Sequence, residues 1–62
     1  MIKYKLLHQF IKDQFVSGTV TIEDLPDETI KVTDKKGDSI VLGIDLETKE
    51  IRDTDGILRG NL

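Results

Sequence analysis

Residues 29–44 organise the whole chain: Thr29-Ile-Lys-Val-Thr-Asp-Lys-Lys-Gly-Asp-Ser-Ile-Val-Leu-Gly-Ile44. Two runs of alternating apolar and polar residues flank a loop in which Gly37 occupies the position where a three-residue hairpin turn needs a left-handed residue. A register shifted by one residue would move the whole apolar set into water. The sequence therefore predicts a β-hairpin with the loop Lys35-Lys36-Gly37, in which Val32 pairs with Ile40 and Ile30 with Leu42.

Residues 3–16 carry two apolar doublets, Leu6-Leu7 and Phe10-Ile11, at a spacing of four. This spacing gives a helix one apolar stripe, which Tyr4 and Phe15 extend, whereas a strand would expose one member of each doublet. Gly18, just beyond the last apolar pair of the segment, Phe15-Val16, is a typical helix stop signal. We expect a helix over 3–16 that packs on another element, because an isolated helix of this length is marginal in water.

Short alternating runs separated by turn signals predict the remaining strands. Residues 19–23 alternate and are rich in β-branched side chains, and the following turn contains Pro26. Leu46 and Ile51 lie on the same face only if the loop between their strands has two or four residues, unless a bulge intervenes. Pairing of Leu46 with Ile51 places Asp45 opposite Arg52. The pair Asp55-Gly56 is favoured in a two-residue type I′ turn. The predicted strands are 19–23, 29–34, 39–46, 50–54 and 57–59, with 60–62 as a loose tail.

These elements predict one α+β domain over residues 1–62, in which an N-terminal helix packs on a four- to five-stranded antiparallel β-meander. The helix stripe would cover the face lined by Val20, Ile22, Ile30, Val32, Ile40, Leu42, Ile44 and Ile51. A small all-β barrel, with residues 2–8 as its first strand, is the alternative. A chain of 62 residues has no room for a second core, and domains of this size gain from self-association.

Composition excludes several classes of function. The chain has no cysteine, which excludes disulfides, thiolate metal sites and thiol nucleophiles. No apolar run approaches the roughly 18 residues of a membrane span, and a signal-peptide pattern is absent, so we expect a cytoplasmic protein. The net charge is −3, with +2 over residues 1–16 and −5 over 17–62. Nucleic acid is therefore an unlikely partner, and weak binding through Lys3, Lys5 and Lys12 is a second alternative.

The motifs that resemble chemical sites have simpler interpretations. Residues 53–56 have the Asp-x-Asp-Gly pattern of a calcium-loop core, but Ile51 and Leu62 would occupy ligand positions, so we predict a turn. His8 is the only histidine, and we expect it to be solvent-exposed beside the helix stripe. The carboxylates around Pro26 are expected to form a solvated acidic turn. We predict no catalytic residue, metal, cofactor or small-molecule substrate, and hence no enzyme.

Three residues are candidates for an interaction surface. Val41 and Gly43 lie on the otherwise polar face of the predicted hairpin, where Gly43 indicates either a bulge or a close contact, and Tyr4 lies on the helix. Our first hypothesis is a small non-enzymatic interaction or assembly protein that associates with itself or another protein, of a size frequent in phages and prophages. The alternative is an acidic regulatory protein that binds and inhibits a basic surface of a host protein.

Overall fold

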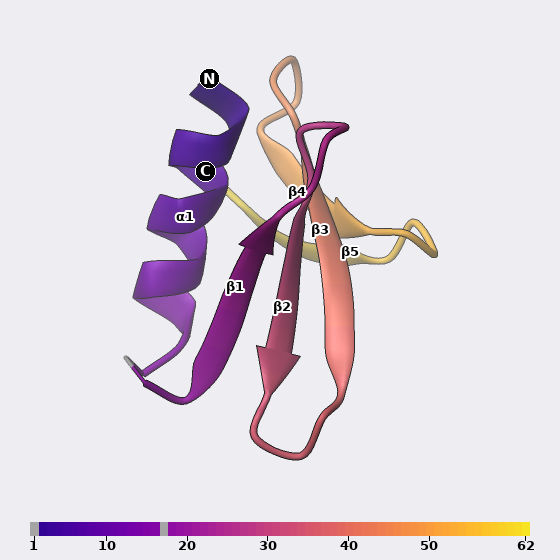
Figure 1. Ribbon diagram of the computed structural model, residues 1–62. Coiled ribbons are helices and arrows are strands. Elements are labelled where there is room, and N and C mark those ends of the chain that lie inside the picture. Colours follow the sequence, from indigo (N-terminus) through magenta and orange to yellow (C-terminus); the bar gives the residue numbers. More distant parts are fainter. Residues whose placement is uncertain (1, 17) are drawn as a thin grey trace.

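The computed structural model describes residues 2–16 and 18–62 as one helix followed by five antiparallel strands (Figure 1). The strands form one open sheet in the order β1-β2-β3-β4-β5. The predicted α+β meander is confirmed, and the barrel alternative is wrong because residues 2–8 are helical and the sheet does not close. The elements are α1 Ile2–Gln14, β1 Val20–Asp24, β2 Ile30–Asp34, β3 Ser39–Asp45, β4 Glu50–Asp53 and β5 Leu58–Asn61.

The hairpin of β2 and β3 has the predicted register, with Val32 opposite Ile40 and Ile30 opposite Leu42. Its turn is closed by the backbone N–H of Gly37, which donates to the Asp34 carbonyl oxygen at 3.1 Å. Gly37 has φ +91°, the left-handed conformation that the sequence required. The N–H groups of Lys36 and Asp38 donate to Oδ1 of Asp34.

The turn between β4 and β5 has the same construction. The N–H of Gly56 donates to the Asp53 carbonyl oxygen at 3.0 Å, and Oδ1 of Asp53 accepts from the N–H groups of Asp55 and Ile57. The loop thus has three residues, and the predicted two-residue type I′ turn is wrong. Both turns share the pattern Asp-x-x-Gly, in which the aspartate side chain binds two backbone N–H groups of its own turn.

The connection between β3 and β4 differs from the prediction. Oδ1 of Asp45 accepts from the N–H of Glu47 at 2.8 Å, and Lys49 adopts φ +63°. These interactions end the strand before Leu46, which belongs to the turn because the Asp45 side chain competes with continued pairing. The predicted pairs Leu46–Ile51 and Asp45–Arg52 are therefore wrong, and the observed pairs are Ile44–Ile51 and Gly43–Arg52.

Gly60 and Asn61 belong to β5, and the N–H of Leu62 donates to the Lys49 carbonyl oxygen at 2.8 Å, which corrects the predicted loose tail over 60–62. Gly60 lies opposite Ile51 and Leu58 opposite Arg52, so Arg59 is an extra residue in a β-bulge. The bulge lets β5 continue to Asn61 rather than end at residue 59. The other elements begin and end within two residues of the predicted bounds.

Helix α1 covers one face of the sheet and packs chiefly against the central strand β3. The buried core consists of Leu7, Phe10, Ile11, Ile30, Val32, Leu42, Ile44 and Ile51. Because the helix lies over the centre, it leaves the edge strand partly uncovered. Ile22 on β1, which was predicted to lie in the covered face of the sheet, is 37% exposed, and Phe15, which was predicted to extend the helix stripe, is 38% exposed.

Candidate functional site

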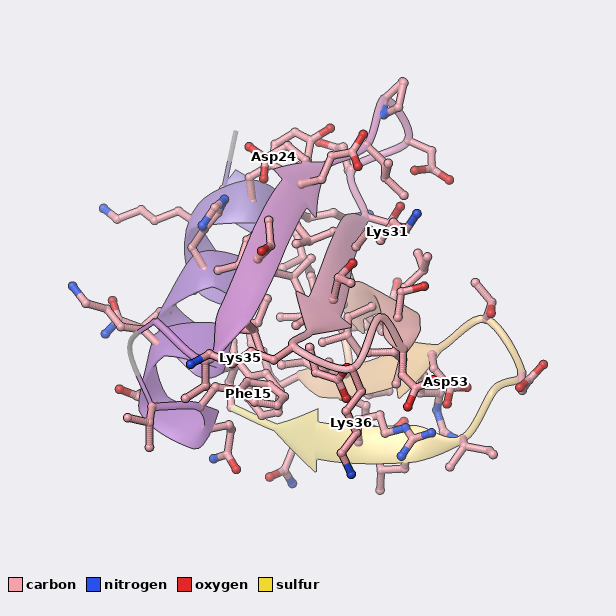
Figure 2. The ribbon with its side chains drawn as sticks, turned by 60° about the horizontal axis from the view of Figure 1, so that its bottom comes forward. Phe15, Asp24, Lys31, Lys35, Lys36 and Asp53 are labelled. Atoms are coloured by element: carbon pink, nitrogen blue, oxygen red, sulfur yellow. The ribbon has the colours of Figure 1, made fainter. Side chains whose placement is uncertain are left out.

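A groove runs between α1 and the edge strand β1. It has a volume of about 340 Å³ and is lined by His8, Ile11, Lys12, Phe15, Val16, Gly18, Val20 and Ile22. We call it the α1–β1 groove. Phe15 lies just past the carboxyl end of α1, and Asp24 lies at the opposite end of β1, beyond the lining residues (Figure 2). Three exposed apolar side chains, Phe15, Val16 and Ile22, give it an apolar surface.

The open edge of β1 presents backbone hydrogen-bonding groups beside this groove. Strand β1 pairs with β2 alone, and the N–H of Leu25 donates to the Thr29 carbonyl oxygen at 2.9 Å just beyond the paired residues. Hydrogen-bonded pairs alternate along an antiparallel ladder. The N–H and C=O groups of Val20, Ile22 and Asp24 therefore point away from β2, toward the open edge. An edge of this kind is a template for another strand.

A polar pair lies beside the groove. Nε2 of His8 is 2.7 Å from Oδ1 of Asp24, and both side chains are about half exposed. His8 was predicted as a solvent-exposed residue beside the helix stripe, and its carboxylate partner was not predicted. Lys12, one helical turn further along α1, also lines the groove. The groove is therefore apolar near Phe15 and Val16 and polar toward Asp24.

The carboxylates around Pro26 have separate partners. Oδ1 of Asp27 accepts a hydrogen bond from the Thr29 hydroxyl, which lowers the pKa of Asp27 despite a smaller opposing effect of burial. Oε2 of Glu28 lies 3.9 Å from Nζ of Lys3. These groups do not form the carboxylate pair that acid–base chemistry uses. Within residues 2–16 and 18–62, no cluster of three or more histidine, aspartate or glutamate side chains has the arrangement of a metal site.

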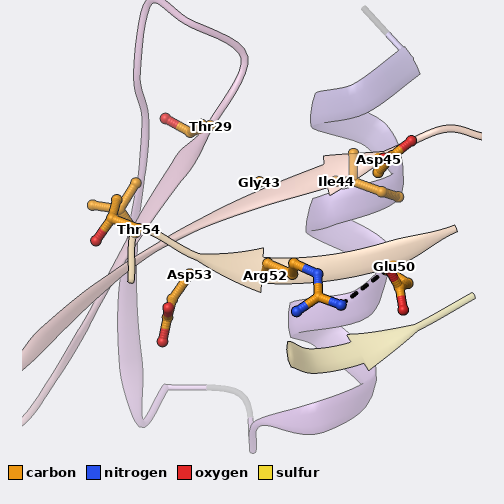
Figure 3. A pocket seen from close by; sticks show the side chains of 9 residues that line it. Thr29, Gly43, Ile44, Asp45, Glu50, Arg52, Asp53 and Thr54 are labelled. Atoms are coloured by element: carbon orange, nitrogen blue, oxygen red, sulfur yellow. Dashed lines mark hydrogen bonds and ion pairs between the residues drawn. The ribbon is translucent and has the colours of Figure 1, made fainter. Parts of the chain in front are cut away.

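A second, open hollow lies on the sheet face opposite α1 (Figure 3). It has a volume of about 320 Å³ and is lined by Thr29, Val41, Gly43, Ile44, Asp45, Glu50, Arg52, Asp53 and Thr54. The guanidinium of Arg52 donates to Oε1 of Glu50 at 3.2 Å and to the Gly56 carbonyl oxygen at 2.7 Å. The charged groups of this hollow are thus already engaged with each other and with the backbone.

Gly43 contributes to this hollow without a bulge. The ladder between β3 and β4 passes through the Gly43–Arg52 pair without a shift in register, so the bulge interpretation is wrong. A Cβ atom at Gly43 would lie 3.5 Å from Cγ2 of Thr29, which is an ordinary contact. The fold therefore has room for a side chain at this position.

The structure brings together two of the three predicted surface residues. Val41 and Gly43 line the outer hollow, whereas Tyr4 lies on the helix side of the sheet. The Tyr4 hydroxyl donates to the Leu25 carbonyl oxygen and accepts from the N–H of Glu28 at 3.2 Å. Tyr4 thus ties α1 to the turn between β1 and β2.

Sequence reasoning missed the residues of the α1–β1 groove that stay exposed, Phe15, Val16 and Ile22. One signal was available: a further apolar pair, Phe15-Val16, follows the doublet Phe10-Ile11 at the end of the predicted helix, and the next strand is the first of a meander and hence an edge. Comparison of the chain with protein-family models, curated proteins and solved structures finds no match. Over the part of the chain that the structure describes, α1 is too short and too polar to cross a membrane.

Proposed function

We propose that this protein is a small, non-enzymatic interaction module that binds a partner protein by strand addition at the α1–β1 groove. One observation carries the proposal: the outward backbone groups of β1 lie beside the exposed apolar side chains of Phe15 and Val16, which follow the end of α1. In strand addition, main-chain hydrogen bonds give affinity and pockets for alternate side chains give specificity. The edge of β1 supplies the first and the groove supplies the second.

The strand that binds would alternate in character. Its side chains on the α1 side would contact Phe15, Val16 and Ile22, and those on the other side would face solvent beside Thr21 and Glu23. Burial of apolar surface contributes about 25 cal/mol per Å², and each backbone hydrogen bond contributes a net of about 0.5–1.5 kcal/mol. The groove therefore favours a short extended segment with an apolar residue at every second position.

The α1–β1 groove is a better candidate than the outer hollow. The hollow around Gly43 is lined by charged groups that already bind one another, as in the contact between Arg52 and Glu50. A ligand there would have to replace these contacts. Among the described residues 2–16 and 18–62, the outward backbone groups of β1 have no hydrogen-bond partner that a ligand would have to replace, because β2 lies on the other side of the strand.

Peptide selection combined with NMR tests the proposal. We expect a library of extended peptides, selected on the immobilised protein, to yield ligands with alternating apolar residues. In the ¹⁵N-labelled protein, these ligands should shift the amide signals of Val20, Ile22 and Asp24 and slow their hydrogen exchange. Ile22→Lys should weaken binding at least tenfold, and the matched outer-face variant Val41→Lys should leave it unchanged. The reverse pattern would move the site to the outer face and contradict the proposal.

An acidic regulatory protein is a second candidate function. The turns β1–β2 and β3–β4 lie at the same end of the molecule in Figure 1, and both carry carboxylates, which are Asp27 and Glu28 in the first and Glu47 in the second. This end favours a basic protein surface. Binding that falls steeply as salt rises would support this candidate, whereas strand addition at the apolar groove should depend little on salt.

A further inference from the structure

We infer that the strand seated in the α1–β1 groove is β1 of a second copy of this chain. This inference rests on the proposed strand-addition function and specifies the partner. The two copies would be related by a two-fold axis that is perpendicular to the sheet and passes midway between the two Ile22 residues. The result is a continuous sheet of ten strands in which both copies of α1 cover the same face.

The hydrogen-bonding pattern of β1 matches itself in this register. The outward backbone groups belong to Val20, Ile22 and Asp24, which are spaced evenly about Ile22. An antiparallel pairing centred on Ile22 places Ile22 opposite Ile22 of the second copy and Val20 opposite Asp24. Each of these pairs exchanges hydrogen bonds, because both members direct their N–H and C=O groups outward. A register shifted by one residue would place residues whose backbone groups point outward opposite residues whose groups point toward β2, so the hydrogen bonds between the two copies would not form.

The charges on β1 and α1 are complementary in the same register. The charged residues of β1, Glu23 and Asp24, lie at its carboxyl end, and its amino end at Val20 and Thr21 is uncharged. Since His8 contacts Asp24, Lys12 lies one turn further toward the amino end of β1, where it lines the groove. Antiparallel pairing brings the acidic end of each strand to the uncharged end and Lys12 of the other copy. Parallel pairing would align the carboxylates with each other.

The pairing also covers the exposed apolar side chains of the groove. Ile22 of each copy enters the groove of the other copy, beside Phe15 and Val16. The contact is isologous, because the same apolar patch of each copy is buried by the other. A domain of 62 residues has a small core and gains stability from such burial. The opposite edge is less suited to pairing, because the bulge at Arg59 interrupts β5.

A charge-swap experiment tests the register directly, because residue 22 faces its own counterpart. Sedimentation velocity of the wild type at micromolar concentrations should give a dimer. Ile22→Lys alone and Ile22→Glu alone should each give monomers, and an equimolar mixture of the two should give the heterodimer. The control is Leu58→Lys, which places the same charge on the exposed surface of β5 and should leave the dimer intact. Amide spectra check that each variant is folded.

A crosslinking variant gives a second measurement that does not depend on weakening the interface. The chain has no cysteine, so Ile22→Cys introduces a single thiol at the proposed two-fold axis. The opposed residues of a hydrogen-bonded pair have Cα atoms about 5.5 Å apart, within the range of a disulfide. Mild oxidation should convert this variant into a disulfide-linked dimer, and Leu58→Cys should remain largely monomeric under the same conditions.

The outcomes separate this inference from the proposed function. A wild type that stays monomeric while its groove binds a selected peptide would overturn the self-pairing and leave strand addition standing. A dimer that survives both Ile22→Lys and Ile22→Glu would also overturn it, because the contact would lie elsewhere. A monomer whose groove binds no peptide would overturn both proposals.

Discussion

The ring of Phe10 on α1 lies directly against the backbone of Gly60 on β5. A Cβ atom at Gly60 would fall 2.4 Å from Cε1 and 2.6 Å from Cζ of Phe10, distances that packed atoms do not adopt. Gly60 pairs with Ile51, whose side chain belongs to the buried core. A glycine, which otherwise weakens a strand, thus provides the space in which the Phe10 ring is held.

We expect Gly60→Ala to lower the free energy of unfolding by about 1–3 kcal/mol, because the added methyl group displaces the Phe10 ring. Urea unfolding measures the change. Phe10→Leu should remove much of this effect, and the double-mutant cycle should give a coupling energy of at least about 0.5 kcal/mol. The matched control is Gly43→Ala, which has room for its methyl group and should be stabilising by about 0.5–1 kcal/mol. An unchanged stability of Gly60→Ala would contradict this packing.

The carboxylate of Asp53 accepts hydrogen bonds from two directions. Nε and Nη2 of Arg59 each lie 2.8 Å from Oδ2, and the N–H groups of Asp55 and Ile57 donate to Oδ1. Burial acts to raise the pKa of Asp53, but the hydrogen bonds from Ile57, Arg59 and Asp55 outweigh it, and the net pKa lies below the usual 3.8. The folded protein therefore favours the ionised carboxylate.

This lowered pKa makes stability depend on pH. The contribution of Asp53 is fully present above pH 3.8, the usual aspartate pKa, and is lost as the pH falls through the lower pKa of the folded state. We expect Asp53→Asn to be less stable than the wild type at neutral pH and to lose less stability on acidification below about pH 4. Urea unfolding at a series of pH values measures both effects. The control is Asp34→Asn, which alters the equivalent turn without an arginine partner, and identical pH profiles for Asp53→Asn and the wild type would refute the prediction.

Gly37 adopts φ +91° in the central turn, where a β-branched residue is strained. We expect Gly37→Val to cost about 1–2 kcal/mol, which for a domain of this size lowers Tm by at least about 4 °C. Gly37→Asn should cost less, because asparagine tolerates the left-handed conformation. Thermal unfolding followed by circular dichroism measures both variants. Equal Tm values for the wild type and Gly37→Val would show that the turn is not of this type.

Tyr4 connects α1 to the turn between β1 and β2 through its hydroxyl group. We expect Tyr4→Phe to reduce the free energy of unfolding by about 0.5–1.5 kcal/mol, because the N–H of Glu28 loses its partner. Hydrogen exchange of the Glu28 amide should accelerate, while amides in the β3–β4 ladder serve as the internal reference. Exchange at Glu28 that does not change would mean that the hydroxyl contributes nothing to the turn.

Local patterns were sufficient for much of the fold. The register of β2 and β3 was predicted because Gly37 defines the turn and side-chain alternation defines the face. The second turn repeats the pattern Asp-x-x-Gly at residues 53–56, but its loop length was mispredicted because Asp55-Gly56 also favours a shorter turn. Leu46 was misplaced for a related reason. Its apolar side chain suits a strand, and the hydrogen bonds of the Asp45 side chain ended the strand first.

Periodicity and turn residues over a few positions are sufficient to specify the helix, the order of the strands and the face that α1 covers. The position of α1 on that face follows only from tertiary contacts. Contacts between distant residues, such as Phe10 with Gly60 and Tyr4 with Leu25, place the helix over β3. That position leaves Ile22 and the edge of β1 uncovered. A local sequence pattern does not predict this exposure, because the exposure of an edge strand depends on how the helix packs across the whole sheet.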